Sequence, residues 1–136
     1  MIEDIDADKV WQALQADPQA QLVDVRTDAE WNFVGVPNLA DLNREVVLIP
    51  WQVYPTMQRN GAFIDHLRQA GIAPETPTYF ICRSGARSMA AAQAAAAAGF
   101  TTVFNVAEGF EGPPDAQGHR GQVSGWKASG LPWHQR

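Results

Sequence analysis

The chain has 136 residues, 46% of them hydrophobic, which is enough material for one domain with one buried core. Its formal net charge of −5 argues against a nucleic-acid or anionic-membrane partner, because such surfaces need clustered Lys and Arg. The longest mostly apolar run, 89–100, is far shorter than the ~20 residues of a membrane span, and the acidic N-terminus lacks the apolar region of a secretory signal. We therefore expect a single cytoplasmic domain over residues 1–136.

Helical and strand patterns alternate in the first half of the chain. Asp6 is a good N-cap before a run of apolar residues at helical spacing, and Gly71 is a helix-ending residue after a second such run. The apolar runs QLVDV and VVLI have the composition of strands in parallel sheets. These patterns predict helices over 7–16 and 62–70, and strands over 21–25 and 46–49.

The second half continues the alternation and then changes character. The pattern predicts a strand over 78–81, a helix over 89–98 and a strand over 101–106. Strands that alternate with helices favour parallel pairing with right-handed crossovers. The segment 107–125 is rich in glycine and has two adjacent prolines, which predicts a long loop that starts near the end of the 78–81 strand and can reach over it.

Cys82 is the only cysteine, which excludes an intramolecular disulfide and a multi-cysteine metal site. It stands where the 78–81 strand ends, and ligands bind at the carboxyl ends of strands in open α/β sheets. A loop that curls into a helix N-terminus directs several backbone N–H groups at one point and adds the positive end of the helix dipole. Such a field favours the reactive thiolate over the thiol.

The candidate site consists of seven consecutive residues. A lone cysteine is more often an inert core residue, but Arg, Ser and Gly are poor core neighbours and good neighbours for an anion. The two arginines add positive charge, and the glycine allows a backbone conformation closed to other residues. The candidate site comprises Cys82 as a reactive thiolate in an anion cradle formed by the backbone N–H groups of Arg83, Ser84, Gly85, Ala86, Arg87 and Ser88.

Several segments of the sequence resemble the rhodanese family of sulfurtransferases. The segment 82–88 (CRSGARS) resembles the family's active-site loop, and 22–26 (LVDVR) with Glu30-Trp31 is similar to its first conserved block. The stretch 34–37 resembles the Gly-His-Ile-Pro motif that follows, and 103–106 together with Trp126 and 130–133 resembles the family's ending. The resemblance covers nearly the whole chain.

This resemblance implies an α/β fold with a central parallel sheet flanked by helices on both faces. It implies no cofactor and a Cys82 persulfide that carries sulfur from a small anionic donor to a thiol, cyanide or protein-thiol acceptor. The arginine directly after the cysteine is similar to the pattern of thiosulfate-using members. Val36, Asn38 and the segment 108–112 depart from the family pattern, which leaves the choice of donor and acceptor open.

Two other functions fit parts of the same pattern. Cysteine-dependent phosphatases and arsenate reductases also set a thiolate at a helix N-terminus, but they place five residues between cysteine and arginine, and here only residues 83–86 intervene. A phosphatase further needs an acid for the leaving group, for which Asp115 is the candidate. A sulfur-relay or protein-binding module of the same fold is the second alternative.

Other polar residues carry weaker signals. Arg26 and Glu30 are four apart, a spacing at which an ion pair forms across a helical turn. His119 and Arg120 lie in the long loop and are candidates for the mouth of the site. The three histidines are dispersed and predict no metal site.

Overall fold

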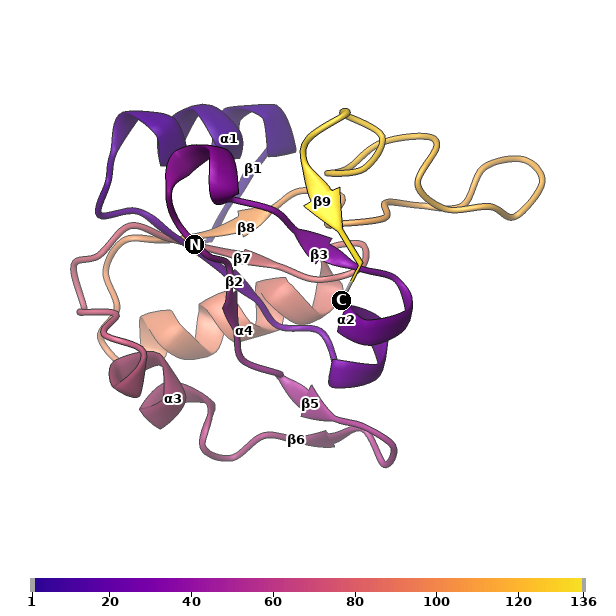
Figure 1. Cartoon of the computed structure of the whole chain (residues 1–136). Helices are drawn as coiled ribbons and strands as arrows, with labels where there is room; N and C mark the ends of the chain where they lie inside the picture. The colour runs from indigo at the N-terminus through magenta and orange to yellow at the C-terminus, as the bar shows by residue number, and fades with distance from the viewer. Residues whose placement is uncertain (1, 136) are drawn as a thin grey trace.

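A computed structural model describes residues 2–135. Its centre is a parallel sheet of five strands in the order β1-β8-β7-β2-β4 (Figure 1). The three interior strands β8, β7 and β2 are mostly buried, as expected for strands covered on both faces. The strands are β1 (Glu3–Ile5), β2 (Gln21–Asp24), β4 (Val47–Leu48), β7 (Thr78–Ile81) and β8 (Val103–Val106).

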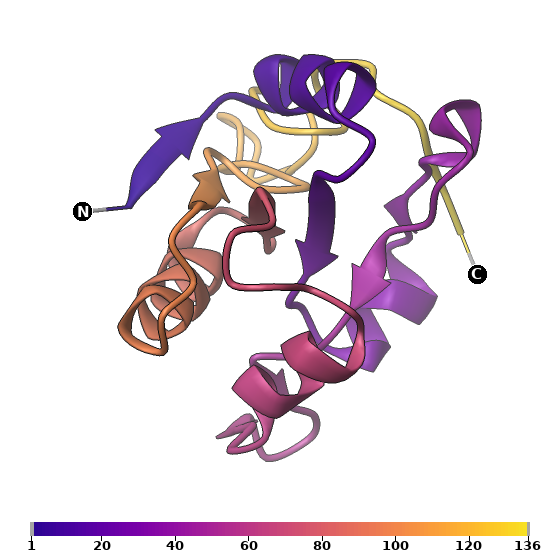
Figure 2. The same cartoon turned by 90° about the vertical axis from the view of Figure 1, so that its left-hand side faces the viewer.

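Helices cover both faces of this sheet. Helix α1 lies on one face and helices α3 and α4 on the other, while α2 follows the carboxyl end of β2 (Figures 1 and 2). This arrangement confirms the predicted α/β class with a central parallel sheet. The helices are α1 (Ala7–Ala16), α2 (Asp28–Phe33), the 3-10 turn η1 (Ala40–Leu42), α3 (Phe63–Gln69) and α4 (Ala86–Ala97).

Each face of the sheet has its own hydrophobic core. Val10 and Leu14 of α1 are fully buried against one face, together with Trp126 from the chain's last quarter. Burial of an aliphatic side chain of this size stabilises the fold by about 1.5–3 kcal/mol. On the other face, Phe63 and Phe80 pack beside the alanine-rich helix α4, whose small side chains let the helix approach the sheet closely.

The structure corrects one predicted helix boundary and adds strands that the sequence did not predict. Helix α4 begins at Ala86 rather than at residue 89, because Gly85 adopts the left-handed conformation and serves as its N-cap. The strand β1 was not expected, since Glu3 and Asp4 obscure any strand pattern. Two antiparallel pairs were also missed: β3 (Val36–Pro37) with β9 (Trp133–His134), and β5 (Gln52–Val53) with β6 (Gln58–Arg59).

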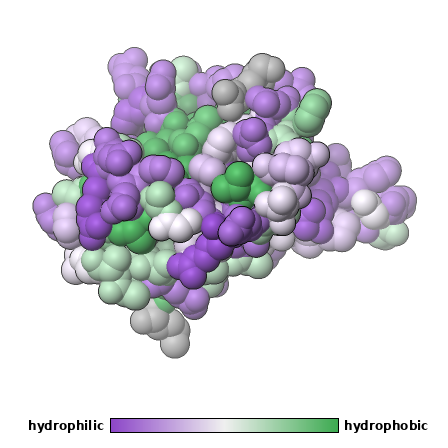
Figure 3. Space-filling view, turned by 90° about the horizontal axis from the view of Figure 1, so that it is seen from below, coloured by the Kyte–Doolittle hydropathy of each residue, from purple (hydrophilic) through white to green (hydrophobic). Residues whose placement is uncertain are grey.

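The predicted long loop is present and has no helix or strand before β9. Phe110 and Trp126 anchor its two ends in the core, and the Trp126 indole N–H donates to the carbonyl of Pro132 at 2.7 Å. The chain between these anchors projects from the body of the molecule (Figure 1). Figure 3 views the side that carries the β5–β6 hairpin and shows this projecting arm as mostly hydrophilic.

Among the described residues, no helix combines the length and the apolar character that crossing a membrane requires.

Candidate active site

Cys82 follows the last residue of β7, near the middle of the sheet. β7 lies between β2 and β8, and its final residue Ile81 is in register with Asp24 of β2. Only 1% of the Cys82 surface is exposed. The thiol is therefore fixed at the carboxyl edge of the sheet, at the position that the sequence predicted.

Two donors point at the sulfur. The backbone N–H of Gly85 and the hydroxyl of Ser88 each donate to Cys82 Sγ at 3.1 Å. The Ser88 hydroxyl also lies 3.2 Å from the Gly85 carbonyl oxygen. Gly85 has a φ of 114°, a backbone conformation that favours glycine, and α4 begins directly after it. The loop thus places a helix N-terminus and two hydrogen-bond donors around one thiol.

The start of the long loop supports the backbone of the cysteine loop. The N–H of Phe110 donates to the carbonyl of Cys82 at 2.8 Å, and the N–H groups of Glu111 and Gly112 donate to the carbonyl of Arg83 at 3.0 and 3.1 Å. Gly109 lies so close that a Cβ there would stand 2.4 Å from the Cys82 carbonyl oxygen. Only glycine fits at this junction.

Arg87 is engaged by Glu30 of α2. Its two terminal nitrogens donate to the two carboxylate oxygens of Glu30 at 2.6 and 2.8 Å. Burial disfavours the charged carboxylate, but the hydrogen bonds and charge of Arg87 outweigh it, and with Thr27 they lower the pKa of Glu30 to about 2. Glu30 also completes a capping box with Thr27 at the start of α2. The pair therefore ties the first turn of α4 to α2.

The expected pair between Arg26 and Glu30 does not form. Arg26 instead binds Asp24 at 2.6 Å, donates to the Gly35 carbonyl at 2.7 Å and lies 4.3 Å above the Phe110 ring. The side chains of Arg26 and Asp24 are both fully buried. The i, i+4 spacing was misleading because Arg26 lies before α2, which begins at Asp28, so Arg26 and Glu30 are not on one helix.

The side chains of the cysteine loop have different surroundings. Arg83, Ser84 and Ala86 are exposed, Gly85 and Arg87 are half-buried, and Ser88 is buried. Arg83 and Arg87 line an open groove of about 490 Å³. The groove is also lined by residues of α2, of the β5–β6 hairpin and of the long loop: Glu30, Val34, Gln52, Met57, Glu111 and Arg120.

Sequence reasoning found some of this groove and missed the rest. Arg120 was a candidate for the mouth, and it does line the groove. Gln52 and Met57 carried no signal, because the polar hairpin that presents them has no hydrophobic alternation. His119 does not line the groove, and within residues 2–135 no three His, Cys, Asp or Glu side chains gather as a metal site.

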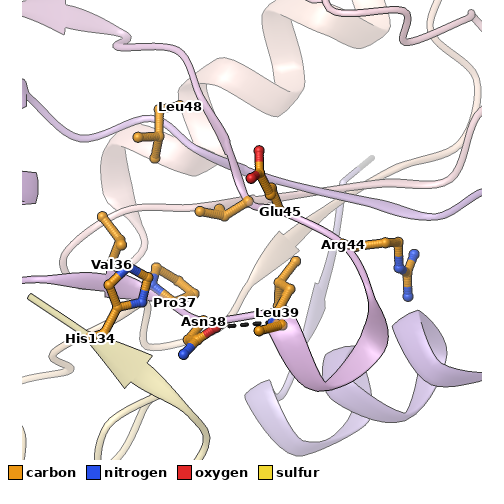
Figure 4. Close-up of a pocket in the computed structure, with 10 residues that line it drawn as sticks. Val36, Pro37, Asn38, Leu39, Arg44, Glu45, Leu48 and His134 are labelled. Carbon is orange, nitrogen blue, oxygen red and sulfur yellow. Dashed lines mark hydrogen bonds between the residues drawn. The ribbon is translucent and has the colours of Figure 1, made fainter. Parts of the chain in front are cut away.

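A second cleft lies away from the cysteine loop. It is bounded by β3, β9 and the chain leading into β4, with Val36, Leu39 and His134 among its lining residues (Figure 4). Arg44 points from this cleft toward α1, where it donates to the carbonyls of Leu14 and Ala20. Arg44 thus satisfies carbonyls at the end of α1 and stabilises a helix C-terminus.

Comparison with known proteins gives consistent matches over nearly the whole chain. The family model described as "STR4 middle domain" matches residues 3–136. The crystal structure of Rv0390 from M. tuberculosis has 48% sequence identity and a TM-score of 0.90, with 98% of each chain covered.

Curated relatives extend these matches. The uncharacterized protein RP600 from Rickettsia prowazekii is 35% identical over 98% of each chain. The Rhodanese-like domain-containing protein 4, chloroplastic, from Arabidopsis thaliana is 30% identical over 93% of this chain, which spans 24% of that longer protein.

Proposed function

Because this chain belongs to the rhodanese-like family, we propose that it is a sulfurtransferase that moves sulfane sulfur through a persulfide on Cys82. The donor is thiosulfate or a similar small anion, and the acceptor is a thiol or cyanide. The observation that carries the proposal is the pair of donors, Gly85 N–H and Ser88 hydroxyl, at 3.1 Å from Cys82 Sγ. Donors in that position stabilise negative charge on sulfur.

The proposed reaction has two balanced halves. The Cys82 thiolate attacks the outer sulfur of thiosulfate, a new S–S bond forms, the donor's S–S bond breaks, and sulfite leaves with the electron pair. An acceptor thiolate then attacks the outer sulfur of the persulfide, and the electron pair returns to Cys82 as thiolate. No external oxidant or reductant is needed, and the enzyme alternates between two forms as in covalent ping-pong catalysis.

The loop residues take separate roles in this proposal. Gly85 and Ser88 stabilise charge on the sulfur, and one such donor in a preorganised site is worth up to about 4 kcal/mol. Exposed Arg83 attracts the anionic donor. Arg87 acts as a positioning residue, because both of its terminal nitrogens are already bound to Glu30.

The same ion pair argues against a phosphatase. A loop arginine that binds a phosphoryl group must present its guanidinium to the substrate. Here the guanidinium of Arg87 is held by Glu30 in a bidentate pair. Asp115, the candidate acid, is not among the residues of the groove beside the cysteine loop.

A protein-thiol acceptor is a second candidate, favoured by exposed apolar side chains of the β5–β6 hairpin. Met57 lines the groove and is 38% exposed, and Tyr54 of the same hairpin is 56% exposed. Exposed large apolar side chains that gather at one place mark contact surfaces for other proteins.

Mass spectrometry of the intact protein tests the proposed function. After thiosulfate treatment and removal of the donor, the protein should be heavier by one sulfur atom, and cyanide or a small thiol should restore the original mass. Cys82→Ser should keep its circular dichroism spectrum and show no mass gain, because the swap removes the nucleophile but little volume. A wild-type protein with no reversible gain from thiosulfate or from a persulfide donor would refute the proposal.

A further inference from the structure

The Ser88 hydroxyl has two acceptors within reach but only one proton to donate. Its Oγ lies 3.1 Å from Cys82 Sγ and 3.2 Å from the carbonyl oxygen of Gly85. Serine side chains in helices commonly donate to a carbonyl three or four residues back, so the Gly85 carbonyl competes with the sulfur for this proton. The sulfur gains a donor only while the proton points toward it.

Two other donors already occupy the Gly85 carbonyl. The N–H of Met89 donates to it at 3.1 Å in the first turn of α4, and Nδ2 of Asn105 in β8 donates to it at 3.2 Å. A carbonyl oxygen has two lone pairs, one for each of these donors. The Ser88 proton is therefore left for the sulfur.

The edge strand β1 fixes the orientation of the Asn105 amide. Asn105 lies in register with Asp4 of β1, and its Nδ2 donates to the Asp4 carboxylate at 2.8 Å. A hydrogen bond to an ionised acceptor is stronger than one between neutral groups. Both neighbours of the amide nitrogen are acceptors, so a flipped amide would set its oxygen against a carboxylate and a carbonyl. Asp4 therefore keeps the nitrogen of Asn105 directed at Gly85.

The Asn105 amide is buried and only half satisfied. The residue is 3% exposed, and within residues 2–135 its Oδ1 has no hydrogen-bond partner. An unpaired acceptor in the interior destabilises a fold, and an apolar side chain of the same shape avoids that penalty. The nitrogen makes both hydrogen bonds of this side chain, so a function of Asn105 resides in the nitrogen.

We propose that Asn105 is a positioning residue, which occupies the Gly85 carbonyl and thereby directs the Ser88 hydroxyl proton to Cys82 Sγ. The inference rests on the proposed function, because it concerns the thiolate that would react there. Without the amide, the Gly85 carbonyl has a free lone pair, and the Ser88 proton divides its time between the carbonyl and the sulfur. The effect of Asn105 on the sulfur thus passes through Ser88.

A double-mutant cycle of Asn105→Leu with Ser88→Ala tests this route. Alkylation of Cys82 by iodoacetamide, followed by intact mass, needs only a thiolate and no sulfur transfer. Below the pH of full ionisation, Asn105→Leu should slow alkylation about threefold when Ser88 is present and less than about 1.5-fold in Ser88→Ala, which has no hydroxyl to direct. Thr78→Val removes a buried hydroxyl that donates to the Thr76 carbonyl at the opposite end of β7, and it should leave the rate unchanged.

Asp4→Ala keeps the test open if Asn105→Leu does not fold. Asp4 is exposed, and its loss releases the amide, so alkylation should slow about twofold, again only when Ser88 is present. Slowing by the same factor with and without the Ser88 hydroxyl, or no slowing in either variant, would overturn the inference.

Persulfide formation from thiosulfate, measured on the same variants, separates the inference from the proposed function. If wild type forms no persulfide while the slowing of alkylation depends on Ser88, the sulfurtransferase assignment fails and the positioning role of Asn105 stands. If the persulfide forms while the slowing is independent of Ser88, the positioning role fails alone.

Discussion

The two loops that follow the neighbouring strands β7 and β8 are built in opposite ways. After β7 the chain needs only residues 82–85 before α4 begins, whereas after β8 it runs from Ala107 to Pro132 without helix or strand. The first loop is fixed by its own backbone and by a helix. The second is fixed where it contacts the first and at its buried anchors Phe110 and Trp126. The short loop holds the thiol on which the proposed function depends, and the start of the long loop supplies backbone donors that support this short loop.

The largest effect is expected where the two loops meet. Gly109→Ala puts a Cβ 2.4 Å from the Cys82 carbonyl oxygen, so the loops must separate, and we expect a loss of about 2–3 kcal/mol in the free energy of unfolding along with most sulfur transfer. Denaturant unfolding measures this change. Gly118→Ala is the matched control, since Gly118 also has a positive φ but has no atom within 4 Å of the added Cβ. Equal losses in the two variants would mean that the contact between the loops does not matter.

A smaller loss of stability is expected from changing Glu30, which pairs with Arg87 at the start of α4. Glu30 has its pKa lowered from 4.5 to about 2, so its stabilisation is complete above pH 4.5 and is lost as the pH falls toward 2. Glu30→Gln should cost about 1–2 kcal/mol at pH 6 and should flatten the pH dependence of stability between pH 4.5 and 2. Thermal unfolding across this range tests it, with Asp28→Asn on the same helix as control. An unaltered acid transition in Glu30→Gln would contradict the role of the pair.

A change within the short loop should affect rate more than stability. Ser88→Ala removes one of the two donors to Cys82 Sγ, and we expect a fall of about five- to tenfold in the rate of persulfide formation, equivalent to about 1 kcal/mol. Stopped-flow or quenched mass measurements give this rate. Ser84→Ala alters an exposed hydroxyl of the same loop and should leave the rate within twofold of wild type. Similar rates for Ser88→Ala and wild type would mean that the Ser88 hydroxyl does not help to form the persulfide.

The smallest effect is expected at the tip of the long loop. Asp115 and His119 already bond to each other through their backbones, so replacing residues 116–118 by one glycine closes the arm with little strain. We expect less than about 0.5 kcal/mol of change in stability and unchanged kinetics of sulfur transfer to a small thiol. A loss of sulfur transfer in this variant would give the tip of the loop a role in the proposed reaction.

Several elements could be predicted because their signal is local. Helix α1 and strand β7 match the expected ranges 7–16 and 78–81, since helical spacing and an apolar β-branched run are each complete within one segment. The charged strand β1 and the polar β5–β6 hairpin have no such pattern. Strand β1 forms because β8, far along the chain, offers it an edge, whereas β5 and β6 pair with each other across a short turn.

The candidate site also has a part that the local sequence predicts and a part that it does not. The segment 82–88 is contiguous, so its place between a strand and a helix follows from the sequence. The pair of Glu30 with Arg87 joins residues 57 positions apart, and no spacing rule reaches that far. Arg26 shows why, because it has a carboxylate both two and four residues away, and only the backbone conformation decides that Asp24 is the one it binds.

The hydrogen bond from the Phe110 N–H to the Cys82 carbonyl also makes hydrogen exchange a probe of how often the site opens. That amide can exchange its hydrogen with solvent only when the two loops separate, so its protection measures the free energy of opening. The Trp126 amide, which donates to the Gly109 carbonyl, reports separately on the anchoring of the long loop. Protection of these two amides in the thiol and persulfide forms would show whether loading sulfur tightens or loosens the junction at which the reacting residue is held.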